Sequence, residues 1–214
     1  MKLTSYACVL FFAIISSTLF SPMNISAQEV FKTVDEPKGL PVGAIVSDFE
    51  AIDQNGKLFN LHEELMQGPM VLIFYRGQWC PVCNRYLSNL QDSLQFIYDK
   101  GARVIAVSPE KPEYLKMTEK KTKAEFTLLY DESYKIAKEF DVLFLPEKET
   151  RDKYNTKLDA HLQDSHSDSS ERLPIPATYI IDKNSKIIWR QFNPNYKIRS
   201  TVHDILVNLP SLEK

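Results

Sequence analysis

The sequence predicts one α/β domain, a three-layer α/β/α sandwich on a central mixed sheet. Residues 70–76 and 103–108 are mainly apolar runs without alternation, as expected for strands that are covered on both faces. A stretch of helical periodicity joins the two runs, so this part of the chain predicts a right-handed βαβ unit. The same alternation of strands and helices continues toward the C-terminus.

The first 27 residues have the layout of a secretory signal peptide. Lys2 stands near the start, an apolar stretch runs from about Tyr6 to Phe20, and Ala27 ends a plausible cleavage site. The apolar stretch has about 15 residues, fewer than the roughly 20 that a spanning helix needs. We therefore expect a protein exported to the periplasm or the medium, and a membrane-anchored one if the segment stays uncleaved. Cys8 precedes most of the apolar stretch, which excludes it as a lipoprotein cysteine.

Cleavage would leave about 187 residues, enough for one domain and too few to expect two. We expect an N-terminal extension over residues 28–40 and the folded domain over residues 41–210. The targeting segment carries one Lys and no acid, so the remaining net charge is −3, from 25 basic and 28 acidic residues. This balance does not indicate a nucleic acid or an anionic membrane as partner.

The elements before the middle of the chain follow from local signals. Residues 46–61 predict a hairpin, with Asn55-Gly56 supplying the positive φ angles of a two-residue turn. After the strand at 70–76, apolar residues recur at three- and four-residue steps, which predicts an amphipathic helix that ends near Gly101. This apolar stripe consists of Leu87, Leu90, Leu94 and Ile97.

A polar segment interrupts the second half of the chain. Apolar residues do not recur at regular steps in residues 147–172, which predicts a surface insertion that is either a lid or only a loop. Regular elements surround it. We expect a helix at 112–121, a strand at 126–130, a helix at 133–140, antiparallel strands at 178–182 and 186–192, and a last helix at 198–209.

The candidate functional site is the pair Cys80 and Cys83, at the junction of the first central strand and the following helix. A helix that begins at Cys80 aims free N–H groups and its positive dipole end at that sulfur, which favours the reactive thiolate. Cys83 lies one turn later, within reach of a disulfide. A zinc site would need about four ligands, and a purely structural bridge over so short a loop would gain little entropy. The pair is therefore interpreted as a working dithiol.

These residues carry a family resemblance. The segment from Phe74 to Cys83, the dipeptide Ile175-Pro176 and the predicted strand order resemble the thioredoxin fold. More closely, residues 40 to 210 resemble the AhpC/TSA family, and within it the peroxiredoxin-like proteins that carry a CxxC motif. The matching segments are Asp48-Phe49, Asn55-Gly56-Lys57, Tyr75-Arg76-Gly77, Trp79-Cys80-Pro81, Leu173-Pro174-Ile175-Pro176-Ala177, and Asn193-Pro194-Asn195-Tyr196 with Arg199.

The resemblance implies that Cys80 and Cys83 are catalytic and that four neighbours shape the site. It also implies a cis peptide bond between Ile175 and Pro176, packed against the cysteines. We expect no metal or other cofactor. The thioredoxin alignment makes Cys80 the exposed nucleophile and Cys83 the more buried resolving thiol. The site-shaping residues are Arg76, Trp79, Pro81 and Pro176.

The chain departs from the usual peroxiredoxin motif, PxxxTxxC followed by an Arg from a later strand. Arg76 stands in place of the Pro, Cys80 in place of the Thr, and Cys83 in place of the peroxidatic Cys, while Pro176 stands near the expected Arg. The hydrogen-bonding groups that make a peroxiredoxin fast are therefore not visible in the sequence.

Other polar residues near the motif have two interpretations each. Arg76 either lowers a thiolate pKa or faces water at the strand end, and Trp79 either closes the edge of the site or contacts substrate. Glu110 is either a rim residue of the site or a solvated loop acid. His161 and His166 lie in the polar insertion without the spacing of a metal site.

Three functions remain. The first is a peroxiredoxin-like peroxidase in which a Cys80/Cys83 dithiol reduces hydrogen peroxide or an organic hydroperoxide and a thioredoxin-type donor reduces the disulfide. The second is an exported oxidoreductase that acts on protein disulfides. The third is a metal-delivery module of the same fold, which would be expected to use a CxxxC pair with a downstream His. The family resemblance favours the first and the local residues favour the second; we take the peroxiredoxin-like peroxidase as the leading hypothesis.

Overall fold

A computed structural model describes residues 30–211. Residues 31–211 belong to one compact unit. The expected targeting segment, with Cys8, lies outside the described residues. None of the helices formed by residues 30–211 is both long and apolar enough to span a bilayer.

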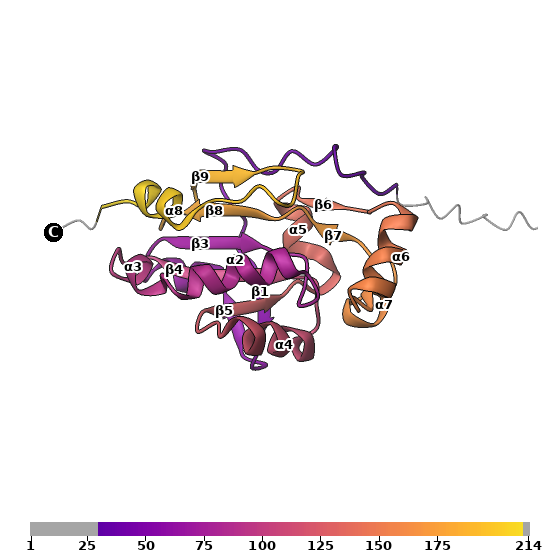
Figure 1. The fold of residues 1–214 in the computed structure, drawn as a ribbon. Coiled ribbons are helices and arrows are strands. Elements are labelled where there is room, and N and C mark those ends of the chain that lie inside the picture. The colour runs from indigo at the N-terminus through magenta and orange to yellow at the C-terminus, as the bar shows by residue number, and fades with distance from the viewer. Residues whose placement is uncertain (1–29, 212–214) are drawn as a thin grey trace, which may run out of the picture. The chain divides into compact units, whose positions relative to one another are not determined.

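A seven-stranded mixed sheet forms the middle layer, in the order β2-β1-β5-β4-β3-β8-β9 (Figure 1). β3, β4 and β5 run parallel, whereas β1 joins β5, and β8 joins β3, in antiparallel fashion. The predicted mixed sheet is thereby confirmed. The bounds are β1 Glu50–Asp53, β2 Leu58–Asn60, β3 Met70–Phe74, β4 Arg103–Ser108, β5 Thr127–Tyr130, β8 Ala177–Ile181 and β9 Ile187–Phe192.

Helices cover both faces of the sheet. Alternate side chains of β3 point to opposite faces, so each face has apolar side chains to bury. Val71 and Ile73 pack in one core with the apolar faces of α2, α3, α4 and α8. Leu72 and Phe74 pack in the other core with α1 and α5. The bounds are α1 Leu61–Leu65, α2 Pro81–Gln91, α3 Leu94–Tyr98, α4 Pro112–Thr122, the 3-10 turn η1 Glu132–Tyr134, α5 Lys135–Glu139 and α8 Val202–Asn208.

The predicted helix after the cysteines is divided in two. Its apolar stripe is buried as expected, but the helix breaks at Ser93, where φ is −117° and ψ is 9°, and resumes as α3. The hairpin turn also differs from the prediction. Only Gly56 of the Asn55-Gly56 pair has a positive φ, and the turn is longer than two residues because the Asp53 side chain accepts hydrogen bonds from the N–H groups of Asn55 and Lys57.

The polar insertion contains regular structure that its sequence did not predict. It holds α6 Lys148–Lys157 and α7 Leu162–Ser165, and short strands flank it, β6 Leu143–Phe144 and β7 Leu173–Pro174. The insertion is attached to the loop after β4, where the Lys111 N–H donates to the carbonyl of Ser165 at 2.8 Å. In Figure 1, α6 and α7 lie together at the end of the sheet where β4 and β5 finish.

The Ile175–Pro176 peptide bond is trans, so the expected cis bond is wrong. The trans form is the intrinsic preference of X-Pro bonds. The chain here is fixed by ordinary backbone pairing, because Leu173 and Pro174 pair with β6 and the Ile175 N–H donates to the carbonyl of Val142 at 2.7 Å.

Candidate active site

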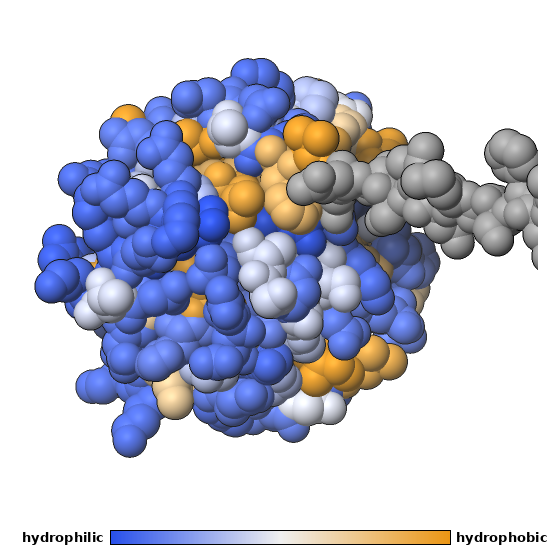
Figure 2. Space-filling model, turned by 90° about the vertical axis from the view of Figure 1, so that its right-hand side faces the viewer, coloured by the Kyte–Doolittle hydropathy of each residue, from blue (hydrophilic) through white to orange (hydrophobic). Residues whose placement is uncertain are grey.

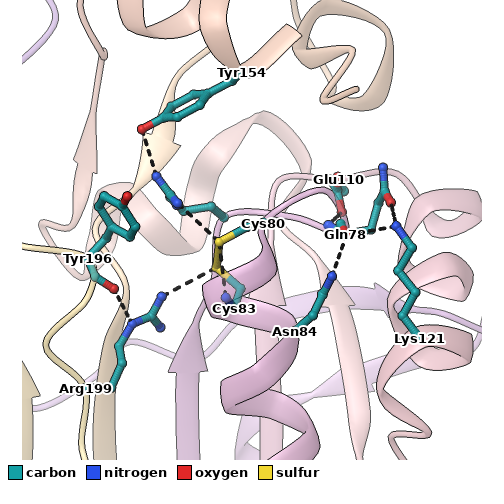
Figure 3. Close-up of a disulfide and its surroundings, with 10 residues drawn as sticks. Gln78, Cys80, Cys83, Asn84, Glu110, Lys121, Tyr154, Tyr196 and Arg199 are labelled. Atoms are coloured by element: carbon teal, nitrogen blue, oxygen red, sulfur yellow. Dashed lines mark hydrogen bonds between the residues drawn. A yellow bond between two sulfur atoms is a disulfide. The ribbon is translucent and has the colours of Figure 1, made fainter. Parts of the chain in front are cut away.

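Cys80 is the N-cap residue of α2, and Pro81 follows in the first turn, where a missing N–H does no harm. Its Sγ accepts a hydrogen bond from the backbone N–H of Cys83 at 3.2 Å. The two cysteines form a disulfide, with their Cα atoms 5.2 Å apart (Figure 3). The helix therefore begins where the sequence predicts, and the N–H of Cys83 in its first turn points at the sulfur of Cys80.

Neither cysteine is exposed to solvent, since both have 0% relative accessibility. The expectation of an exposed Cys80 is wrong for this disulfide state. Trp79, at 5%, closes the site next to the cysteines, and its ring packs against that of Tyr154 of α6 at a tilt of 35°, with centroids 4.8 Å apart. The insertion therefore contributes a wall of the site.

Arg76 is buried, which excludes the interpretation that it faces water. Its Nη2 donates to Cys80 Sγ at 3.2 Å, and its Nη1 donates to the hydroxyl of Tyr154 at 2.9 Å. Its guanidinium also lies 3.9 Å from the ring centroid of Tyr196, a cation–π contact. Burial lowers the pKa of this guanidinium, although an arginine remains charged at neutral pH.

A second arginine, Arg199, contacts the sulfur of Cys83. It was not predicted as a site residue. Its Nη2 lies 3.5 Å from Cys83 Sγ, within hydrogen-bond reach of sulfur, and its Nε donates to the carbonyl of Tyr196 at 2.7 Å (Figure 3). Burial, with a smaller contribution from the charge of Arg76, lowers the pKa of Arg199 to about 10. Each sulfur of the pair thus has its own guanidinium donor.

Glu110 is fully buried, so its interpretation as a solvated loop acid is wrong. It follows β4, and its Oε2 accepts the backbone N–H of Gln78 at 2.7 Å. Desolvation raises the pKa of Glu110 to about 8, against the opposing effect of that hydrogen bond. Glu110 therefore fastens the loop that leads into Cys80 and is mostly a neutral acid at pH 7.

A pocket of about 600 Å3 opens beside the disulfide. Its lining includes Arg76, Tyr154, Tyr196 and Pro176, so the structure brings Pro176 close to the predicted site. The N-terminal segment that starts at Phe31 lines it as well. Figure 2 shows patches of apolar surface on a face that is otherwise largely hydrophilic.

The two histidines of the insertion are not part of this site. His166 is buried and its Nδ1 lies 3.1 Å from the hydroxyl of Tyr134, while His161 is exposed and pairs with Asp159. Within residues 30–211, no group of three or more His, Cys, Asp or Glu side chains is placed to hold a metal ion.

The sequence missed Tyr154 and Arg199 for different reasons. Tyr154 lies in α6, which buries no residue and so has no apolar stripe. It is an aromatic residue in an otherwise polar segment, and that is the signal that could have singled it out. Arg199 lies in the irregular segment before α8, in a stretch that the family resemblance had already marked.

A helix-capping CxxC pair on a thioredoxin-like sheet defines a thiol redox enzyme. The model of the AhpC/TSA family matches residues 42–190, and the chain belongs to this family. Among curated proteins, it is 31% identical over 203 residues to the chloroplastic peroxiredoxin Q of Gentiana triflora, across 92% of this chain and 80% of that protein. It is 34% identical over 104 residues to peroxiredoxin Bcp of Escherichia coli K12, across 48% of this chain and 65% of that protein.

Solved structures agree on the fold. Peroxidoxin BcpB from Mycobacterium tuberculosis superposes with a TM-score of 0.62 at 20% identity, across 82% of this chain and 99% of that one. A peroxiredoxin-like protein from Aquifex aeolicus superposes with a TM-score of 0.59 at 16% identity, across 80% and 87% of the two chains. The predicted thioredoxin-like fold and the predicted class, a peroxiredoxin-like thiol oxidoreductase, are both confirmed.

Proposed function

We propose that this chain reduces hydrogen peroxide or organic hydroperoxides by a dithiol–disulfide cycle of Cys80 and Cys83, with a thioredoxin-type protein as electron donor. The observation that carries the proposal is the buried guanidinium of Arg76 on Cys80 Sγ. The sequence motif lacks the Thr and Arg of a typical peroxiredoxin, and Arg76 supplies a charged donor in their place. Such a donor favours a thiolate and also stabilises charge that develops on a peroxide oxygen.

The cycle has three steps. The Cys80 thiolate attacks one peroxide oxygen, so that an S–O bond forms, the O–O bond breaks, and the alcohol or water leaves with a proton. Cys83 then attacks the sulfenic sulfur, the S–S bond forms, and the hydroxyl leaves as water. A donor dithiol reduces the resulting disulfide by two exchange reactions and becomes a disulfide itself. The disulfide of this structure corresponds to the product of the second step.

Burial of the sulfurs favours a small oxidant over a protein disulfide. A peroxide can enter a closed site, whereas a protein disulfide must bring its own backbone to a sulfur with 0% accessibility. The second candidate, exchange with exported protein disulfides, is favoured by the position of Cys80 at a helix N-terminus. A donor or substrate protein that opens the site would reach the sulfurs in either function, the peroxidase cycle or the exchange with protein disulfides.

Trapping of the sulfenic acid tests the order of attack. The reduced Cys83→Ser variant should consume one equivalent of hydrogen peroxide and give a dimedone adduct on Cys80, located by mass spectrometry of peptides. The matched Cys80→Ser variant should react slowly, because Cys83 is not the N-cap of α2. Equal or faster reaction of Cys80→Ser would overturn the assignment of Cys80 as nucleophile.

The proposed location is outside the cytoplasm. The proposal is supported by the layout of residues 1–27, and peroxiredoxin Q of Gentiana triflora is itself named as a chloroplastic protein. The mass and N-terminal sequence of the protein isolated from its cells test this point. A mature chain that starts near Gln28 supports export, and a chain that retains residues 1–27 in the cytosolic fraction contradicts it.

A further inference from the structure

The disulfide lies between two positive charges. Arg76, 3% exposed, contacts Cys80 Sγ, and the partly buried Arg199 contacts Cys83 Sγ. Their remaining polar contacts are neutral, the hydroxyl of Tyr154 for Arg76 and the carbonyl of Tyr196 for Arg199. Among residues 30–211, no carboxylate forms an ion pair with either guanidinium, and the main cause that lowers the pKa of each is burial.

This arrangement is unfavourable in the oxidised state. A buried cation without an anionic partner loses hydration that neutral contacts replace only in part. The aromatic faces around Arg76 compensate for some of the loss. Arg76 also keeps a buried Nε–H without a hydrogen-bond acceptor. The oxidised site therefore has two cations and no counter-charge close to them.

Reduction of the disulfide supplies the missing charge. Each cysteine that is released as a thiolate becomes the anionic partner of its own arginine, at a distance already suited to a charged hydrogen bond. Opposite charges at this range attract strongly in a site shielded from water. Stabilisation of the reduced form makes a disulfide a stronger oxidant.

We propose that Arg76 and Arg199 together make Cys80–Cys83 an oxidising disulfide, one that takes its electrons from weakly reducing thiols such as glutathione or protein dithiols. This rests on the proposed function and deepens it, because it extends the donors of the same cysteine pair from a thioredoxin-type protein to weakly reducing thiols. With glutathione, the protein disulfide and two thiols give a protein dithiol and one molecule of glutathione disulfide. For each cysteine that remains a thiolate, one proton is released to solvent.

A route for a small thiol exists beside the site. The pocket of about 600 Å3 has Arg76 among its lining residues, and Arg76 contacts the sulfur of Cys80. Tyr154 and Tyr196 line the same pocket, and the rings of both contact the guanidinium of Arg76. A small thiol that enters the pocket therefore meets the guanidinium that contacts the sulfur of Cys80.

Equilibration of the mature protein with mixtures of reduced and oxidised glutathione tests the proposal without peroxide. The reduced fraction, measured by alkylation and mass spectrometry, gives the equilibrium constant K for reduction of the protein disulfide by glutathione at each pH. Glutathione remains a thiol between about pH 6 and pH 7.5, so log K should rise by at least one for each pH unit if a thiolate is held. A log K that does not change over this range would overturn the proposal.

Variants separate charge from packing. Arg76→Met and Arg199→Met should each lower K by about tenfold or more, the scale of a charged hydrogen bond, and should reduce the pH slope. Arg76→Lys and Arg199→Lys keep the positive charge, so their K should stay close to that of the wild type. These two variants also test the proposal if a Met variant folds poorly. Arg103→Met is the matched control, because Arg103 already pairs with Glu64 on the surface.

Equal K values for the wild type, Arg76→Met, Arg199→Met and Arg103→Met would contradict the proposal. Failure of the peroxidase function would give a different result. In that case K and its pH slope would follow the proposal, while hydrogen peroxide would oxidise the reduced protein no faster than it oxidises glutathione.

Discussion

The hydroxyl of Tyr154 accepts a hydrogen bond from Arg76 at 2.9 Å, which joins the polar insertion to the cysteine site. The same tyrosine ring packs against that of Trp79. α6 itself has no buried residue and is tied to the rest of the insertion by the ion pair of Arg151 with Glu171 at 2.7 Å. Tyr154 is thus the contact through which α6 covers the site.

Tyr154→Phe should weaken both the fold and the reaction. The Nη1 of Arg76 would lose its acceptor while it remains buried, which costs about 1–3 kcal/mol of unfolding free energy. The less firmly held guanidinium should also slow oxidation of the reduced protein by peroxide. Denaturant unfolding and stopped-flow fluorescence measure the two effects. Tyr98→Phe, on an exposed part of α3, is the control, and an equally small effect of both variants would contradict the role of Tyr154.

Glu110→Gln should make the stability of the protein less dependent on pH. Burial raises the pKa of Glu110 to about 8, above its value of about 4.3 in an unfolded chain. Between these values the folded state binds more protons, so this group makes stability fall as the pH rises, by at most about 1.4 kcal/mol per pH unit. A glutamine keeps an acceptor for the Gln78 N–H and has no proton to lose.

Denaturant unfolding at several pH values between about 5 and 8 measures this effect. The difference between wild type and variant is the relevant quantity, because Asp131, with its pKa raised to about 7 by burial, and His166, with its pKa lowered to about 3, titrate in both proteins. Parallel curves for wild type and Glu110→Gln would exclude a raised pKa at Glu110.

Gly77→Ala should destabilise the loop before the cysteines. Gly77 has φ of +154°, and a Cβ there would lie 2.5 Å from both Glu110 Oε1 and Trp79 Nε1. Strain and overlap together should cost about 2 kcal/mol or more of unfolding free energy. Gly43→Ala is the control, because Gly43 also has a positive φ, +93°, but open space around it. Equal free energies of unfolding for Gly77→Ala and Gly43→Ala would show that the loop before Cys80 accommodates a Cβ without strain.

The fold followed from the sequence where burial leaves a periodic pattern. β3 is buried along its whole length and reads as a continuous apolar run, and the stripe from Leu87 to Ile97 packs in one core. The break between α2 and α3 was missed because that stripe continues across it. α6 was missed because a helix without buried residues has no stripe to detect.

The site followed from the sequence only as far as the CxxC motif itself. The helix start at Cys80 is local and was predicted, but the partners of the sulfurs come from segments that are distant in sequence. Arg199 lies 116 positions from Cys83, and Tyr154 lies 78 positions from Arg76. Burial of Glu110 depends on the Gln78 N–H and on the missing Cβ of Gly77, and no pattern within one segment encodes such a contact.

The most direct test of the central claim is the rate at which hydrogen peroxide oxidises the fully reduced mature protein, followed by fluorescence of Trp79 beside the cysteines. We expect a rate at least about a hundredfold above that of glutathione, the scale of one charged donor at a reacting centre, and slower reaction with a disulfide-bonded protein at equal concentration. Slow oxidation by peroxide together with rapid exchange against the protein disulfide would contradict a peroxidase and identify a disulfide oxidoreductase.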